Sequence, residues 1–190
     1  PKAQEPAPAD IQSARRAAME FDLRLKREIT DRLERSEDPV AVYLAYADHT
    51  PGWAREISNQ FELDFSRTAL GVRNPSSAPD DWERQQLETF NFLMDAGLDP
   101  DTFENAEIVQ EGDETVFRWL RPVRMIDTCL ACHGGEIDPR INLLLAQEYP
   151  LDEASGYSEG QIGGADFGRE GVRVGRPAAP RRTPDPNPAG

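Results

Sequence analysis

Basic side chains are scarce in this sequence: 21 Lys and Arg stand against 35 Asp and Glu, which gives a formal net charge of −14. A surface with this charge repels nucleic acid and anionic lipid, so we expect neither as a partner and expect a protein partner to be basic. The chain also lacks a long apolar run. The longest lies at 141–146, whereas about 20 residues are needed to cross a bilayer. We therefore expect no membrane span.

The start of the chain contains neither a methionine nor an apolar leader. We expect that a signal peptide has been removed, which predicts a periplasmic or extracellular protein. No cysteine lies near the start to carry a lipid anchor.

Composition divides the chain into three parts. Residues 1–8 are proline-rich and predict an extended arm, residues 9–167 predict a single domain, and residues 168–190 form a tail rich in Gly, Pro and Arg. The tail carries five Arg against two acidic residues. We expect this basic tail to lie in an acidic groove of the same chain or on a neighbouring subunit of a homo-oligomer.

The spacing of apolar residues predicts both helices and strands. Apolar residues recur every three or four positions from Ala9 to about Arg35, which predicts a long N-terminal helix. Similar spacing predicts further helices at 38–46, after Pro51, at 80–97 and at 139–148. Alternating or turn-bounded segments predict strands at 64–72, 106–110 and 114–122 and an extended stretch at 156–167. Helices packed on a small antiparallel sheet make the expected fold class α+β.

Both cysteines and one of the two histidines lie in one segment, Cys129-Leu130-Ala131-Cys132-His133. Cys-x-x-Cys-His is the attachment pattern of c-type haem, in which two thiols add to the vinyl groups and the histidine reaches the iron. We predict one covalent haem c, bound through Cys129 and Cys132 with His133 as an axial ligand. Bacteria attach this haem outside the cytoplasm, which agrees with a periplasmic location. The alternatives are a zinc site, which needs a fourth ligand, and a redox dithiol of a thioredoxin-like unit.

The second axial position of the iron decides the chemistry of such a haem. We favour His49, the other histidine, as the second ligand, with Tyr46, one helical turn earlier, as the alternative. Methionine sulfur can also bind haem iron, and the chain has Met19, Met94 and Met125. Helical spacing places the first two of these in the core. The iron would stay open on this side if none of these side chains reached it.

Several further segments, in a fixed order between about residues 40 and 166, match a known family. They are Phe65 to Leu70, Arg73-Asn74-Pro75, Ala78 to Glu83, Phe117 to Pro122, Cys129 to Gly134, Tyr149-Pro150 and Ala154 to Tyr157. With these segments the chain resembles the periplasmic PAS-like haem-c domain, which bacteria and cyanobacteria carry alone or ahead of sensor histidine kinases. The resemblance implies a PAS-like antiparallel sheet flanked by helices, with the haem against the sheet.

The same resemblance suggests roles for three arginines. Arg67, Arg73 and Arg121 are candidates to bind the haem propionates, since arginine makes paired hydrogen bonds to carboxylates. The alternative is that they only pair with the many acidic side chains. One departure from the family concerns the iron, because members often carry a cysteine where this chain has Tyr46, and this chain has no third cysteine.

These observations together predict a mono-haem c-type cytochrome that transfers one electron outside the cytoplasm and could assemble into a homo-oligomer. Its redox partner would be a basic protein. The alternative is a haem-based sensor of redox state or of a small ligand, without a transmitter domain of its own. We do not expect an enzyme.

Overall fold

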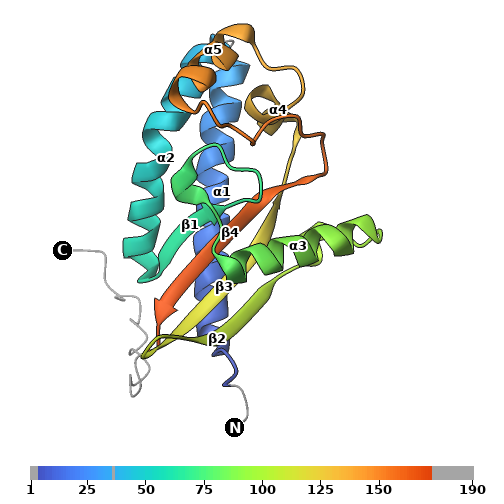
Figure 1. Ribbon diagram of the computed structural model, residues 1–190. Coiled ribbons are helices and arrows are strands. Elements are labelled where there is room, and N and C mark those ends of the chain that lie inside the picture. Colours follow the sequence, from blue (N-terminus) through green and yellow to red (C-terminus); the bar gives the residue numbers. More distant parts are fainter. Residues whose placement is uncertain (1–3, 36, 173–190) are drawn as a thin grey trace, which may run out of the picture.

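The computed structural model describes residues 4–35 and 37–172. Its helices are α1 (Pro8–Glu34), α2 (Pro39–Phe61), α3 (Asp81–Asp95), α4 (Asp127–His133) and α5 (Pro139–Glu148), with short 3-10 turns η1 (Pro75–Ser77) and η2 (Pro100–Thr102). Its strands are β1 (Asp64–Thr68), β2 (Asn105–Glu111), β3 (Glu114–Arg124) and β4 (Ile162–Gly171). They form one antiparallel sheet in the order β1-β4-β3-β2. The sheet is flanked by helices (Figure 1), which confirms the predicted α+β class and the long N-terminal helix.

An aspartate followed by proline starts two of the helices. The side chain of Asp38 accepts a hydrogen bond from the backbone of Val40 (2.8 Å), and Asp138 caps α5 in the same way through Arg140 (2.8 Å). Proline at the first helical position loses no hydrogen bond, because that N–H has no partner inside the helix. This local chemistry sets the start of both helices near the haem segment.

The predicted break at Pro51 was wrong, because α2 continues through it as a single helix. A proline inside a helix loses one backbone hydrogen bond and normally bends or ends the helix. Here the hydroxyl of Thr50 donates to the carbonyl of Tyr46 (2.5 Å), and the buried side chains of Tyr43 and Ile57 anchor the two halves. Packing on both sides of the proline therefore outweighs the local preference.

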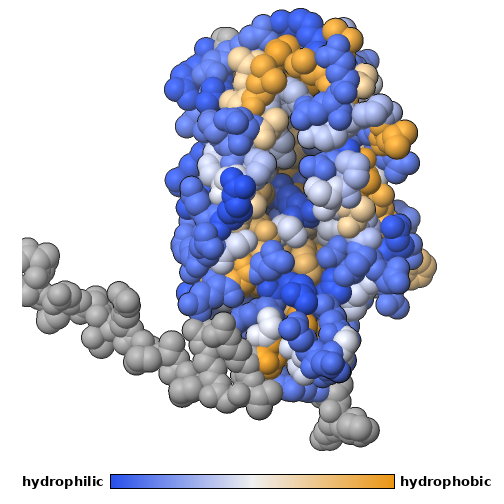
Figure 2. All heavy atoms as spheres, turned by 60° about the vertical axis from the view of Figure 1, so that its left-hand side comes forward, coloured by the Kyte–Doolittle hydropathy of each residue, from blue (hydrophilic) through white to orange (hydrophobic). Residues whose placement is uncertain are grey.

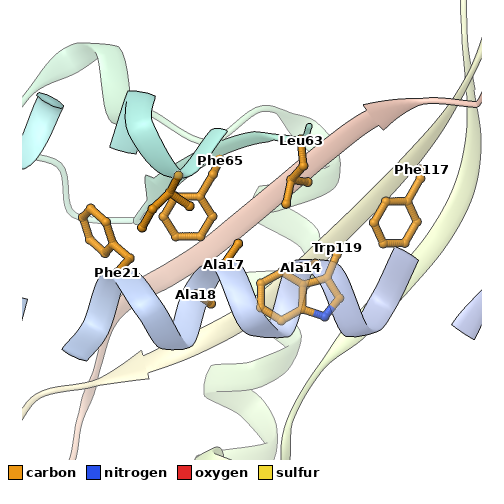
Figure 3. Packing of buried hydrophobic residues seen from close by; sticks show 9 residues of the cluster. Ala14, Ala17, Ala18, Phe21, Leu63, Phe65, Phe117 and Trp119 are labelled. Carbon is orange, nitrogen blue, oxygen red and sulfur yellow. The ribbon is translucent and has the colours of Figure 1, made fainter. Parts of the chain in front are cut away.

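The two faces of the sheet carry separate cores. Trp119 packs on one face against α1, while its neighbour Leu120 packs on the other face among residues of α3. Small residues let α1 lie close to the sheet (Figure 3), and the buried residues of this cluster are Ala14, Ala17, Ala18, Phe21, Ile57, Leu63, Phe65, Phe117 and Trp119. A Cβ at Gly168 of β4 would lie 2.7 Å from Leu63 Cδ1, so a larger residue there would require the Leu63 side chain to shift.

The end of the domain lies further along the chain than composition predicted. β4 continues to Gly171 and pairs with β1 and β3, so the predicted start of the tail at residue 168 falls inside a strand. Its glycines disfavour a strand by propensity, but neighbouring strands on both sides supply the hydrogen bonds. The predictions for 173–190 lie outside the described residues. No helix within the described part of the chain has the length and apolar character to cross a membrane.

Candidate haem site

The short helix α4 carries both cysteines and His133, and it follows β3 at the end of the sheet where α5 also lies (Figure 1). Cys129 and Cys132 are free thiols and half-buried, and their spacing of three residues places them on neighbouring parts of the helix surface. Cys132 packs against a cluster that includes Tyr43 and Ile141. Burial raises the pKa of the Cys132 thiol. The Cys132 thiol therefore lies beside an apolar surface, as attachment of a porphyrin edge requires.

The ring of His133 is oriented by the segment that follows α5. Its Nδ1 lies 2.7 Å from the carbonyl oxygen of Ala154, and since a carbonyl only accepts, Nδ1 is the protonated nitrogen. The backbone is held as well, because Tyr157 donates to the carbonyl of His133 (2.9 Å) and Gly156 to that of Gly134 (3.0 Å). A histidine bonded in this way through Nδ1 presents the lone pair of Nε2 to a metal.

The surroundings of His133 favour the neutral form of its ring, which is the form in which histidine binds metals. Burial, followed by the positive charge of Arg73, lowers the pKa of His133. Gly134 follows directly, and a Cβ there would lie 2.6 Å from the carbonyl oxygen of Leu130. The chain therefore needs glycine at this position in order to leave α4 tightly and return to Tyr157.

Arg73, one of the predicted propionate ligands, holds the haem segment in place. Its Nη2 donates to the carbonyl of Cys132 (2.7 Å), to Asp152 (3.1 Å) and to the carbonyl of Ala154 (3.3 Å). The same guanidinium therefore ties the end of α4 to the segment that orients His133. Its Nε is buried and has no hydrogen-bond partner among the described residues. One donor of Arg73 is thus still available to an acceptor such as a propionate.

Arg67 and Arg121, the other two candidates, are already paired with carboxylates. Arg67 donates to Asp22 and, at 2.8 Å, to Asp166. Arg121 donates to Asp22 at 3.1 Å and lies 3.6 Å from Asp166. Both arginines are partly exposed, so a further contact to a propionate would add to these pairs or compete with them.

The two candidates for the second axial ligand have different neighbours on α2. His49 lies beside Glu28 of α1 (Nδ1 to Oε1, 3.5 Å) and near Asp48 (Nε2 to Oδ2, 3.9 Å), and its ring is 5.7 Å from that of Trp53. Carboxylates therefore lie near both ring nitrogens. Tyr46 is half-buried, one turn earlier on the same helix.

Arg67 interacts electrostatically with both Tyr46 and His133. Burial lowers the pKa of Arg67, but the negative charges of Asp166 and Asp22, and then Tyr46, raise it more. The positive charge of Arg67 also contributes to lowering the pKa of His133, after burial and Arg73.

The methionines are less suited to bind iron at this place. Met125 is buried and packs directly against Gly163 of β4. Met94 lines a small cavity of about 180 Å³ together with Leu70 and Leu87. Met19 lies exposed on α1, so its predicted place in the core was wrong. None of these three side chains belongs to the cluster around Cys132.

A space-filling view with α2 turned forward shows the molecule hollowed along its middle (Figure 2). Polar side chains lie in the hollow, and apolar ones gather at its upper end, toward the end of the molecule that carries α5. A haem, with its apolar ring and two carboxylates, needs such a combination of surfaces.

Sequence reasoning missed the residues that orient the site. Asp152 and Ala154 lie about twenty residues after the motif, and a backbone carbonyl leaves no signature in a sequence. Asp22 and Asp166 were missed too. The sequence did contain a signal for Asp166, which is an isolated acidic residue in the Gly- and Ala-rich stretch before Phe167. An acidic residue in a strand that becomes buried needs a charged or hydrogen-bonding partner.

Comparison with known proteins agrees with the observed fold. A structural search matches the crystal structure of the cyanobacterial heme-protein Tll0287 with a TM-score of 0.65 and 19% sequence identity, over 90% of this chain and 100% of that one. At this identity the likeness demonstrates a shared fold. No curated protein matches this sequence. The model of the Tll0287-like family matches residues 4–168. Since this match spans most of the sequence, the chain belongs to the Tll0287-like family.

Proposed function

We propose that this chain binds a single haem c through Cys129 and Cys132 and transfers one electron. The observation that carries the proposal is the hydrogen bond from His133 Nδ1 to Ala154 (2.7 Å), which leaves Nε2 free beside two free thiols. The fold likeness to a protein described as a heme-protein supports it. When bound, the haem supplies an iron that accepts and returns one electron.

The residues around α4 would hold the haem from three directions. The thiols would fix one edge of the ring, and the cluster of Tyr43, Ile141 and Leu145 would cover apolar surface beside it. The unpartnered Nε of Arg73 would donate to a propionate. The neutral ring of His133 would bind the iron without first losing a proton, since burial lowers its pKa.

We propose His49 and Tyr46 as the two candidates for the second axial ligand. Tyr46 interacts electrostatically with Arg67, as His133 does, whereas carboxylates lie near both ring nitrogens of His49. The variants Tyr46→Phe and His49→Ala separate the two, because only loss of the true ligand changes the visible spectrum of the oxidised protein.

The proposed location and partner follow from the cofactor and the charge. Bacterial haem c attachment takes place outside the cytoplasm, so we place the protein in the periplasm. The net charge of −14 would steer a basic redox protein toward it and repel an acidic one. Because such steering is screened by salt, the association rate with a basic partner should fall as ionic strength rises.

The direct test is co-expression with the machinery that matures c-type cytochromes. Covalent haem would stay with the chain on a denaturing gel, and the pyridine adduct would show the spectrum of a haem with two thioethers. The double variant Cys129→Ala/Cys132→Ala should lose the gel-stable haem, while the matched control His49→Ala should keep it. Absence of covalent haem in the unmodified chain would refute the proposal.

A haem-based sensor is the second candidate function. The position of His49 beside Glu28 and Asp48 favours it, because the second side of the iron could then bind a small ligand. Carbon monoxide separates the two functions. A reduced protein whose spectrum ignores the gas would support electron transfer, and rapid binding of the gas would support sensing.

A further inference from the structure

Asp166 is a charged residue at the centre of the sheet, with no solvent-exposed surface (0%). It lies on β4 directly between Arg67 of β1 and Arg121 of β3, which are its cross-strand partners. Arg67 Nε donates to Oδ1 at 2.8 Å, whereas Arg121 Nη2 approaches Oδ2 only to 3.6 Å. As a result, Oδ2 is buried and accepts no hydrogen bond from the described residues.

Asp22 of α1 competes for the same two arginines. It accepts one hydrogen bond from Arg67 and one from Arg121 (3.1 Å). The charged groups that face Asp166 from the packed elements are therefore two guanidiniums and one carboxylate. When both carboxylates are ionised, the net charge of the four groups is zero. A proton on Oδ2 of Asp166 would leave a net charge of one, shared by two arginines that remain paired with Asp22.

Burial raises the pKa of Asp166, and the neighbouring charge of Asp22 opposes the lowering by Arg67. The geometry shows which oxygen would accept a proton. Oδ2 is an oxygen with a free lone pair, whereas Oδ1 is held by Arg67. Protonation at Oδ2 therefore breaks none of the hydrogen bonds in the network.

The network connects the predicted haem segment with solvent. On one side, Gly71 follows the end of β1 and packs against the segment that orients His133, since a Cβ there would lie 2.6 Å from the carbonyl oxygen of Glu153, next to Ala154. On the other side, a cavity of about 370 Å³, lined by residues including Met19, Glu104 and Arg121, reaches the network. Arg67 and Arg121 are themselves partly exposed, so the network lies next to solvent.

We propose that Asp166 is a redox-linked proton-binding site, which takes up one proton when the haem iron takes up one electron. This inference rests on the proposed haem function. The electron comes from an external one-electron donor and reduces the iron from the ferric to the ferrous state. The proton comes from solvent and forms an O–H bond at Oδ2. On reoxidation the electron leaves to an acceptor and the proton returns to solvent.

A second buried carboxylate among the described residues, Glu83 of α3, offers a matched control. Glu83, 8% exposed, lies on the opposite face and pairs with Arg118 (Oε1, 3.2 Å). Its other oxygen, Oε2, accepts from the backbone of Asp80 (3.2 Å), so neither oxygen lacks a partner. Glu83→Gln therefore removes a buried, arginine-paired charge without removing the proposed proton site.

The test is the midpoint potential of the haem-loaded protein as a function of pH. Between the pKa of Asp166 in the oxidised protein and its higher pKa in the reduced protein, the potential should fall as pH rises. The slope should approach about 59 mV per pH unit, the one-electron equivalent of a tenfold change in proton concentration. Asp166→Asn should abolish this slope and Glu83→Gln should keep it. A slope that persists in Asp166→Asn, or is lost in both variants, would overturn the proposal.

Infrared difference spectroscopy gives an answer even if Asp166→Asn fails to fold. Protein grown with aspartate labelled at the side-chain carboxyl should show, on reduction, a new C=O band of a protonated acid that shifts with the label. Absence of such a band across the pH range would overturn the proposal. The haem gel is run first, so failure to bind haem is seen separately as a failure of the proposed function.

Discussion

Replacing Arg73 with Gln removes the guanidinium that connects α4 to the segment behind His133. Arg73 and Asp152 are 13% and 14% exposed, so the variant leaves a nearly buried carboxylate without its partner. Charged hydrogen bonds contribute about 1.5–3 kcal/mol each, and removing one partner of a buried pair costs about 3–5 kcal/mol. These values describe the same contacts and are not summed. We expect a loss of about 3 kcal/mol in the free energy of unfolding.

Urea unfolding measures this loss directly, provided that the slope against urea is unchanged. For a chain of this size, 3 kcal/mol corresponds to a fall in Tm of about 6–12 °C. Arg15→Gln is the matched control. Arg15 makes two hydrogen bonds of 2.6 Å to Glu104, but its side chain is 54% exposed, so about 0–1 kcal/mol is expected.

Equal losses in the two arginine variants would refute the reasoning, because burial would then make no difference. A second variant tests the mechanism. Adding Asp152→Asn to Arg73→Gln removes the unpaired charge and should restore part of the lost stability. We also expect Arg73→Gln to alter the visible spectrum of the haem-loaded protein, because Ala154, which orients His133, loses a contact.

Three further substitutions test packing and capping, each by urea unfolding. Ile57→Ala should cost about 2–5 kcal/mol, since Ile57 is fully buried beside the sheet; a loss below about 1 kcal/mol would contradict its place in the core. Gly164→Ala should cost about 1–3 kcal/mol, because its Cβ would lie 2.7 Å from the backbone carbonyl oxygen of Thr68, and an unchanged stability would contradict this close approach. Asp38→Ala should cost about 1 kcal/mol through the lost bond to Val40, and no loss would mean that the cap is made by another group.

Elements with strong local signals were predicted well from the sequence. α5 has the predicted bounds, because Asp138 and Pro139 define its start and apolar spacing defines its length. The hairpin of β2 and β3 also agrees to within two residues, since its turn contains Gly112 with a positive φ of 62°. In these places local preference and tertiary packing favour the same conformation.

Elements whose stability comes from distant partners were predicted poorly. α2 continues through Pro51 because Tyr43 and Ile57 pack on either side of it, and β4 extends to Gly171 because both neighbouring strands pair with it. Neither effect has a local signal. Proline predicts the end of a helix and glycine the end of a strand, and only tertiary packing overrides these local preferences.

The same distinction explains what could be inferred about the site. Cys129, Cys132 and His133 form a local pattern, and the sequence alone is enough to predict a haem at α4. The direction of the His133 ring depends on the carbonyl of Ala154, 21 residues later, so this hydrogen bond could only come from the structure.

Asp22, Arg67, Arg121 and Asp166 form a network of charged groups that also depends on distant parts of the chain. A carboxylate with no exposed surface costs free energy unless it is paired, and Asp166 is hydrogen-bonded through only one of its oxygens. Two hydrophobic residues of the same volume would stabilise a sheet at least as well as an ion pair. Stability alone therefore does not explain why four charged groups from four elements meet at this point. A group that gains and loses a proton must be charged in one state and neutral in the other. The two arginines stabilise the charged form of Asp166, and the oxygen without a hydrogen bond gives the proton a place in the neutral form.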